Sequence, residues 1–239
     1  MSDVIFEIAD LSVKYGEFIA VSDVSMSIPK GSIVSVLGTN GSGKTTLMNT
    51  AAGLCAPFLG EIRFMGEDIT GISPDMIVER GISLVPQGGR CFNRMSVLDN
   101  LMAGSFVKRA RGNAGKSLDR VFELFPVLYE KRHLPAGSLS GGQRQMAAIG
   151  RSLMSEPQLM LFDELSLGLA PVVIKDIYAA IKRISSEEGT TVILVEQDTA
   201  RAMQMSDYTY IMLKGSVVLE GASSELSAEE VRKAYFGSR

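Results

Sequence analysis

The sequence predicts an α/β protein built around a mainly parallel sheet. Three strongly apolar runs, "SIVSVLG", "QLMLFDE" and "TVILVEQ", are continuous rather than alternating, which is typical of strands covered on both faces. Helical patterns such as "GKTTLMNTAAGL" and "VVIKDIYAAIKRISSEE" lie between runs of this kind. Alternation of strands and helices indicates parallel strands joined by covering helices.

Two stretches depart from this alternation, and they define the predicted organisation of one domain over residues 1–239. Residues 1–30 are typical of antiparallel strands with turns at "KYGE" and "IPKG", the start of an antiparallel β-subdomain. Residues 92–138 are mostly helical and are expected to form an inserted helical subdomain. Residues 31–91 and 139–239 are then the α/β core.

The composition is that of a soluble globular protein, with 46% hydrophobic and 21% charged residues. A net charge of -3 provides no basic field for nucleic acid, so no nucleic-acid partner is expected. Cys55 and Cys91 lack metal-ligand spacing and are expected to be packing residues. The sequence has neither a signal-peptide pattern nor an apolar run of about 20 residues, so any membrane role is expected to depend on a partner.

The stretch "GTNGSGKT" fits the phosphate-loop pattern G-x-x-x-x-G-K-[ST] between a strand and a helix. Its glycines let backbone N–H groups surround a phosphate, and the helix N-terminus adds partial positive charge. Lys44 is expected to reach the β- and γ-phosphates, and the Thr45 hydroxyl is expected to bind Mg²⁺. The alternative is a glycine turn that precedes a lysine by chance. The residues expected to contact the nucleotide are Gly38, Thr39, Asn40, Gly41, Ser42, Gly43, Lys44, Thr45 and Thr46.

Two acids follow the apolar run of "LMLFDE". Asp163 is expected to bind Mg²⁺ or its waters, and Glu164 is expected to polarise the attacking water. A buried strand followed by two solvated acids is the alternative, which the phosphate loop in the same chain disfavours.

The stretch "LSGGQRQ" indicates a second helix N-terminus that can hold an anion. Capping by Ser140 alone would explain one serine but not the two glycines that follow it. The residues expected to bind phosphate here are Ser140, Gly141, Gly142 and Gln143.

With these motifs in this order, the sequence resembles the ATP-binding subunits of ABC transporters over essentially its whole length. The resemblance implies a P-loop NTPase fold with a RecA-like parallel core, an N-terminal antiparallel β-subdomain and an inserted helical subdomain. It implies that two subunits enclose two ATP molecules head to tail, so that Ser140, Gly141 and Gly142 touch the γ-phosphate bound by the partner. It also implies that Tyr15 stacks on adenine. Gln87 matches the Q-loop, where its amide would bind Mg²⁺ or the attacking water; a solvated loop residue is the alternative.

Three departures from the family pattern narrow the resemblance. Leu165 replaces the usual proline after Glu164, Ala170 replaces the usual aspartate in "SLGLAP", and Gln197 replaces the switch histidine. The last two, with "VRKAYFGS" near the C-terminus, resemble the shorter ATPase subunit of importers for branched-chain and other hydrophobic amino acids. A glutamine amide can bind the γ-phosphate and water but cannot exchange a proton, so Glu164 would be the sole general base. A strand-end glutamine that satisfies a loop carbonyl is the alternative for Gln197.

The resemblance implies an ATPase that uses ATP and Mg²⁺ and powers import by head-to-tail dimerisation. Its expected partners are integral-membrane permeases, a second ATPase subunit that is identical or different, and indirectly a solute-binding protein. It is expected to be peripheral, on the cytoplasmic side of the inner membrane. The alternatives are a cassette for urea, amides or another solute, and an ABC ATPase acting on DNA or ribosomes. A P-loop small-molecule kinase would not explain "LSGGQ".

Overall fold

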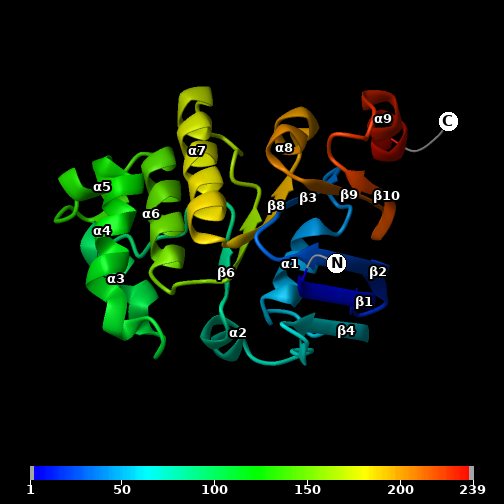
Figure 1. Ribbon diagram of the computed structural model, residues 1–239, viewed down its shortest axis with the longest axis horizontal. Helices are drawn as coiled ribbons and strands as arrows, with labels where there is room; N and C mark the ends of the chain where they lie inside the picture. Colours follow the sequence, from blue (N-terminus) through cyan, green and yellow to red (C-terminus); the bar gives the residue numbers. More distant parts are fainter. Residues whose placement is uncertain (1–2, 237–239) are drawn as a thin grey trace.

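The computed structural model describes residues 3–236, which form two β-sheets with helices around them (Figure 1). The first sheet has four antiparallel strands in the order β2-β1-β4-β5. Its long strands alternate between buried and exposed residues, as expected for a sheet with one face on the core. The bounds of its strands are β1 (Val4–Tyr15), β2 (Phe18–Pro29), β4 (Leu59–Phe64) and β5 (Glu67–Asp68).

The second sheet has six strands in the order β10-β9-β3-β8-β7-β6 and is mainly parallel. All its neighbouring strands pair in parallel except the edge pair β9–β10, which is antiparallel. Strands β3, β7 and β8 are buried at every residue, which confirms the expectation drawn from their continuous apolar runs. The bounds are β3 (Ile33–Gly38), β6 (Ile82–Val85), β7 (Leu159–Asp163), β8 (Thr191–Glu196), β9 (Tyr208–Leu213) and β10 (Ser216–Ala222).

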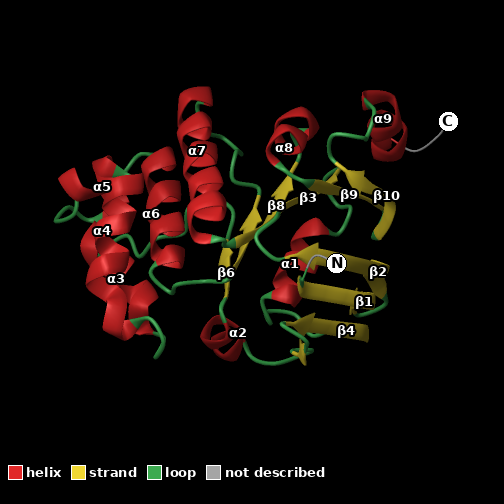
Figure 2. Cartoon of the chain, in the orientation of Figure 1, coloured by secondary structure: helices red, strands yellow, loops and turns green. Residues whose placement is uncertain are grey.

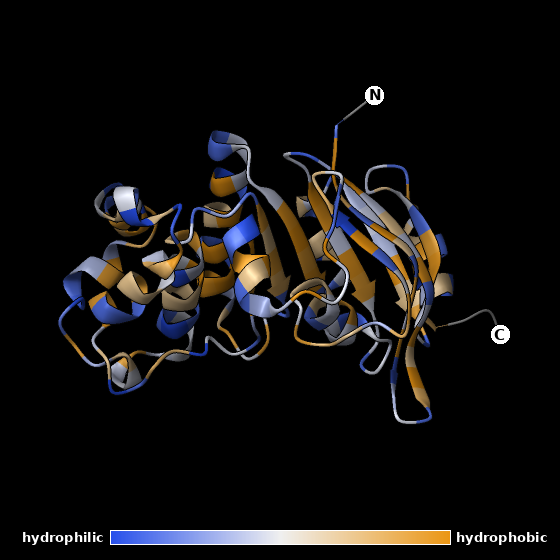
Figure 3. Ribbon diagram, turned by 90° about the horizontal axis from the view of Figure 1, so that it is seen from below, coloured by the Kyte–Doolittle hydropathy of each residue, from blue (hydrophilic) through white to orange (hydrophobic). Residues whose placement is uncertain are grey.

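The helices cover the parallel sheet on two sides (Figure 2). Helix α1 contacts strands of both sheets, and its Leu47 and Met48 share an apolar cluster with the antiparallel sheet. The opposite face of the parallel sheet shares a second cluster with residues of α6, α7, α8 and α9. Figure 3 shows the apolar strands between these layers. The bounds are α1 (Lys44–Ala51), α2 (Pro74–Arg80), α6 (Gly141–Leu153), α7 (Pro171–Glu188), α8 (Thr199–Met205) and α9 (Ala228–Phe236).

A group of short helices lies at one end of the molecule and packs against α6 (Figure 1). These helices are α3 (Val97–Met102), η1 (Ala103–Phe106), η2 (Arg111–Asn113), α4 (Ala114–Leu124), α5 (Pro126–Glu130) and η3 (Ala136–Ser138), where η marks a 3₁₀-helix. The stretch "RARGNAGK" within this group contains η2 and the start of α4. Among the helices of residues 3–236, none has the length and apolarity needed to cross a membrane.

The strands assigned to the two sheets differ from the sequence expectation in one respect. Residues 31–91 were expected in the α/β core, whereas β4 and β5 from that stretch pair with the antiparallel sheet, through the β1–β4 register of Phe6 with Phe64. The antiparallel sheet therefore draws on residues 4–29 and 59–68. The C-terminal "VRKAYFGS" lies in α9 up to Phe236, and its last two residues are outside the described part.

Candidate functional site

The phosphate-loop residues join the end of β3 to the start of α1. Gly41 and Gly43 have φ angles of 79° and 101°, a region that glycine enters without a steric penalty. Gly43 is the residue immediately before the helix. The hydroxyl of Ser42 is buried and has no hydrogen-bond partner within the part of the chain described. A buried donor of this kind at a helix N-terminus fits an anion held by the loop.

The ammonium of Lys44 points back across this loop. It donates hydrogen bonds to the carbonyl oxygens of Gly38 at 2.8 Å and Thr39 at 3.0 Å, and it lies 3.9 Å from Glu164 Oε1. The side chain is only 3% exposed. This burial lowers the pKa of Lys44, while the charges of Glu164 and Asp163 oppose the shift. The ammonium is therefore a buried cation within reach of the loop.

Asp163 and Thr45 form a hydrogen-bonded pair of oxygen groups beside Lys44. The Thr45 hydroxyl donates to Asp163 Oδ1 at 3.2 Å, which brings the C-terminal end of β7 against the first turn of α1. Burial raises the pKa of Asp163; the Thr45 hydrogen bond opposes this shift, and the neighbouring Glu164 carboxylate adds to it. A cation placed here would favour the ionised form of the Asp163 carboxylate.

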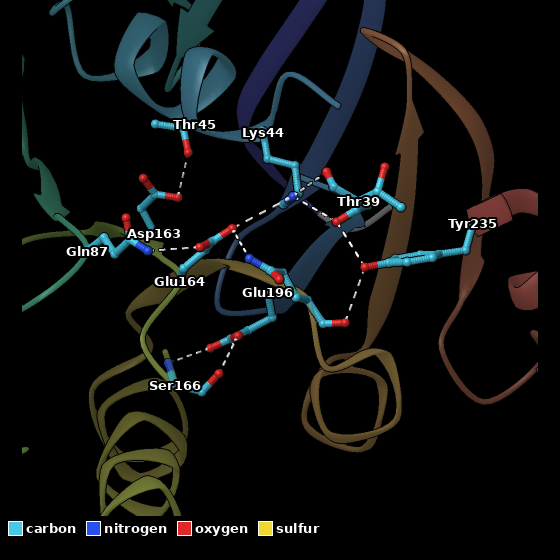
Figure 4. A network of polar contacts seen from close by, with 11 residues as sticks. Thr39, Lys44, Thr45, Gln87, Asp163, Glu164, Ser166, Glu196 and Tyr235 are labelled. Carbon is cyan, nitrogen blue, oxygen red and sulfur yellow. Dashed lines mark hydrogen bonds and ion pairs between the residues drawn. The ribbon is translucent and has the colours of Figure 1, made fainter. Parts of the chain in front are cut away.

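Glu164 lies between the side-chain amides of two glutamines (Figure 4). Gln87 Nε2 donates to Glu164 Oε2 at 3.0 Å, and Gln197 Nε2 donates to Glu164 Oε1 at 2.7 Å. Glu164 itself has a φ angle of 48°, and its N–H donates to the carbonyl of Val195 at the end of β8. Both carboxylate oxygens are thus oriented by neutral donors. The alternative for Gln197 was a hydrogen bond to a loop carbonyl. Its side-chain nitrogen instead donates to the Glu164 carboxylate.

Lys44, Thr45, Gln87, Glu164 and Gln197 border one cavity of about 480 Å³, whereas Asp163 is not among its lining residues. Tyr15 borders it with 51% of its surface exposed, and the Tyr15 hydroxyl lies 3.2 Å from Cys55 Sγ. Phe18 and Leu167 also border the cavity, and the motifs did not single out either residue. The residues around the cavity are Tyr15, Phe18, Ala20, Asn40, Gly41, Gly43, Lys44, Thr45, Thr46, Gln87, Glu164, Leu167 and Gln197.

The second helix N-terminus lies apart from this cavity. Ser140 caps α6 by accepting from the Gln143 N–H, and Gln143 Oε1 accepts from the Ser140 N–H and from Lys131 Nζ. Ser140 and Gly141 are exposed, and neither borders the cavity. At Gly142, a Cβ atom would clash with the side chain of Val173 on α7. Gly142 therefore has a packing requirement in addition to the role expected from the motif.

A buried carboxylate next to Gln197 was missed in the sequence. Glu196 is 1% exposed, and it accepts hydrogen bonds from the Ser166 N–H at 3.1 Å, the Ser166 hydroxyl at 2.7 Å and the Tyr178 hydroxyl at 2.9 Å. Burial raises the pKa of Glu196, and these donors oppose the shift. An acid that directly follows a continuous apolar strand was the available signal. This contact fastens the loop after Glu164, where Leu165 replaces the usual proline.

Tyr235 on α9 is a further residue that the motifs did not reveal. Its hydroxyl lies 3.1 Å from the Gly38 carbonyl oxygen and 3.4 Å from that of Gln197. The stretch "VRKAYFGS" contains Tyr235, but its pattern indicates only the subfamily and not this contact.

The donor set fits a nucleotide with a hard cation. Thr45, Asp163 and the side-chain oxygen of Gln87 are oxygen ligands, the class that Mg²⁺ prefers. Across residues 3–236, no three His, Cys, Asp or Glu side chains converge as a metal cage. In nucleotide sites Mg²⁺ is held by one or two protein ligands together with phosphate oxygens and waters, which fits the small donor set of Thr45, Asp163 and Gln87.

Comparison with known proteins agrees with this geometry. Residues 21–166 match the family described as "ABC transporter". A protein of Pseudomonas aeruginosa, the high-affinity branched-chain amino acid transport ATP-binding protein BraG, is 41% identical over 95% of this chain and 97% of its own length. A probable branched-chain amino acid transport ATP-binding protein of Archaeoglobus fulgidus, LivF, is 32% identical over 92% of this chain and 93% of its own.

The fold is also similar to solved structures. An ATP-binding cassette of an ABC transporter in its ADP conformation superposes with a TM-score of 0.84 at 27% identity, covering 98% of this chain and 96% of that one. CbiO1 of Clostridium perfringens, part of the ABC transporter complex CbiONQ, gives a TM-score of 0.84 at 26% identity, covering 99% of this chain and 96% of that one. The P-loop α/β fold inferred from the motifs is confirmed. By its sequence, its fold and its phosphate loop, this chain belongs to the ABC transporter family and is one of that family's ATP-hydrolysing subunits.

Proposed function

We propose that the chain powers import of branched-chain or other hydrophobic amino acids by hydrolysing Mg·ATP between two ATPase subunits. The observation that carries the ATPase chemistry is the convergence of Lys44, Thr45 and Glu164 on one cavity. Asp163 is hydrogen-bonded to Thr45 behind this lining, and Glu164 is oriented by two amides. The names of the relatives BraG and LivF support the solute class.

In this proposal the phosphate loop and Lys44 bind the β- and γ-phosphates, and Tyr15 borders the adenine. Thr45, Asp163 and Gln87 hold Mg²⁺, which would neutralise charge on the phosphate oxygens and orient them for in-line attack. Glu164 accepts the proton of the attacking water as general base. Gln197 positions the water and the γ-phosphate through its amide while the same amide orients Glu164.

The position of the signature residues supports a head-to-tail dimer. Ser140 and Gly141 are exposed at the N-terminus of α6, outside the cavity that the same subunit forms. Helix N-terminal N–H groups bind phosphate oxygens. A second ATPase subunit, identical or different, would place its cavity against this helix end, so that each ATP touches both subunits.

A groove beside the short helices supports a permease partner. It encloses about 570 Å³ between α2, η1 and α6, and Phe92 and Phe106 line it with 55% and 78% of their surfaces exposed. The Arg151 guanidinium lies over the Phe92 ring at 5.2 Å. Because Phe92 follows Gln87 by five residues, a membrane subunit docked here would be linked to the ATP cavity. The chain would then be peripheral on the cytoplasmic side of the membrane.

The test compares purified wild-type protein with Glu164→Gln. The wild type should hydrolyse ATP only with Mg²⁺, and Glu164→Gln should bind ATP, form a stable dimer on gel filtration and lose at least about 99% of turnover. Hydrolysis by Glu164→Gln at the wild-type rate would contradict the proposed base. Cells lacking the chain should lose uptake of labelled leucine and keep uptake of labelled urea. Stimulation of hydrolysis by DNA or ribosomes, without any membrane partner, would favour the alternative function.

A further inference from the structure

The last described helix, α9, reaches the catalytic end of the parallel sheet through one side chain. The Tyr235 hydroxyl lies within hydrogen-bond distance of the carbonyl oxygens of Gly38 and Gln197, at 3.1 and 3.4 Å. Gly38 begins the phosphate loop, and Gln197 carries the amide that orients Glu164. Figure 4 shows the Tyr235 ring extending from α9 towards these loops. One phenol thus joins three segments that are far apart in the sequence.

The chemistry of this contact is asymmetric. A phenol has one hydrogen, so it donates fully to one carbonyl or shares the hydrogen between the two. The Gly38 carbonyl also accepts from Lys44 Nζ at 2.8 Å, and its two lone pairs can serve both donors. Burial and the Glu164 carboxylate raise the pKa of Tyr235, so the phenol keeps its hydrogen at neutral pH. At neutral pH the hydroxyl is therefore a hydrogen-bond donor to the phosphate loop at Gly38 and to the backbone of Gln197.

The packing around Tyr235 leaves its hydroxyl as the contact between α9 and the backbone of Gln197. Val231, one turn earlier in α9, is buried against the core, and the rings of Tyr235 and Phe236 meet edge to face at 5.4 Å. A cavity of about 410 Å³ lies between α8 and α9, with Gln197 and Tyr235 among its lining residues. Helices α8 and α9 are thus not closely packed against each other beside Gln197. Beside this cavity, α9 contacts the Gln197 backbone through the hydrogen bond of the Tyr235 hydroxyl.

We propose that Tyr235 is a positioning residue for hydrolysis, which acts by holding the backbone of Gln197 beside the backbone of Gly38. The Gln197 side chain is then directed at Glu164, to which it donates at 2.7 Å. This inference rests on the proposed roles of Glu164 and Gln197. It assigns the C-terminal helix a part in the ATPase reaction rather than in stability alone.

The test is Tyr235→Phe in the full chain, which keeps the ring and removes the hydroxyl. Loss of one neutral hydrogen bond that orients the switch should lower kcat about five-fold, with the KM for ATP changed less than about two-fold. Tyr208→Phe is the matched control, because Tyr208 lies on β9 and its hydroxyl makes no hydrogen bond to Gly38 or Gln197. It should leave both constants unchanged.

Two further readouts separate positioning from a general packing effect. In a Gln197→Ala background, Tyr235→Phe should not lower kcat further, because it acts through Gln197. In the ATP-free protein, Tyr235→Phe should speed amide hydrogen exchange around residues 196–199, and the control should not. A wild-type kcat in Tyr235→Phe, or kcat losses that multiply in the double variant, would overturn the inference. Failure of the proposed function would look different, as undiminished hydrolysis by Glu164→Gln.

Discussion

The side-chain amide of Gln197 donates a 2.7 Å hydrogen bond to Glu164 Oε1, so the switch residue directly contacts the carboxylate proposed as the general base. A second amide, that of Gln87, binds the other carboxylate oxygen at 3.0 Å. Both neighbours are neutral and cannot take the proton that Glu164 accepts. The base is therefore oriented by two groups that do not compete with it for the proton.

The first prediction concerns the chemistry of Gln197. Gln197→Ala should lower kcat about 10- to 100-fold, because one positioned donor is lost, and should change ATP affinity much less. Gln197→His should retain a donor to Glu164 but add a group with a pKa near 6.5. The imidazolium formed below that pH would pair with Glu164 and weaken it as a base. A kcat–pH profile should therefore fall below about pH 6.5 for Gln197→His, relative to the wild type; superimposable profiles would contradict this role.

The second prediction concerns the buried carboxylate of Glu196. Glu196→Ala would leave the Ser166 N–H and the Tyr178 hydroxyl without their acceptor, which should lower the free energy of unfolding by about 2–4 kcal/mol. Glu196→Gln keeps an oxygen that accepts from these donors, so it should change the free energy of unfolding by less than about 1 kcal/mol. Urea unfolding at pH 7 measures both differences. Equal effects of the two variants would show that these hydrogen bonds do not stabilise the loop.

The same residue gives a signed pH dependence. Burial raises the pKa of Glu196 above its ordinary value of 4.5, so between 4.5 and the higher native value the folded state binds more protons than the unfolded state. This contribution to stability is complete below pH 4.5 and is lost as the pH rises through the native pKa. Because Glu196→Gln cannot titrate, its free energy of unfolding relative to the wild type should rise with pH across that window. A constant difference between pH 4 and 8 would contradict the shift.

The sequence predicted those parts of the fold and site that are encoded in short, continuous stretches of residues. Continuous apolar runs predicted the buried parallel strands. The motifs predicted a shared Mg²⁺ role for Thr45 and Asp163, whose side chains do approach each other. Contacts between distant segments were not predictable in this way. Ser166 and Glu196 are 30 positions apart with the whole of α7 between them, and nothing in either segment specifies the partner. The pairing of β4 with β1 likewise depends on tertiary packing rather than on local propensity.

The third prediction separates the two signature glycines. Gly142→Ala places a methyl group against Val173, so α6 and α7 must move apart, and the free energy of unfolding should fall by about 1–3 kcal/mol. Gly141→Ala is its matched control for folding, since the nearest atom to an added Cβ is Leu169 Cδ2 at an ordinary 3.7 Å. Gly141→Ala should therefore keep wild-type stability while weakening ATP-driven dimerisation. The reverse order of stabilities in thermal or urea unfolding would refute this division.

The last prediction concerns Tyr15, whose ring borders the nucleotide cavity with half of its surface exposed. If the ring stacks on adenine, Tyr15→Ala should weaken ATP binding about ten-fold, because base–aromatic stacking contributes about 1–3 kcal/mol. Tyr15→Phe keeps the ring and removes the hydroxyl, with its 3.2 Å contact to Cys55, and ATP affinity should stay within about two-fold of the wild type. Equilibrium binding of ATP and of inorganic triphosphate distinguishes the causes, since triphosphate has no base and its affinity should not respond to either substitution. A matching loss of triphosphate affinity in Tyr15→Ala would mean that Tyr15 supports the phosphate loop instead of the base.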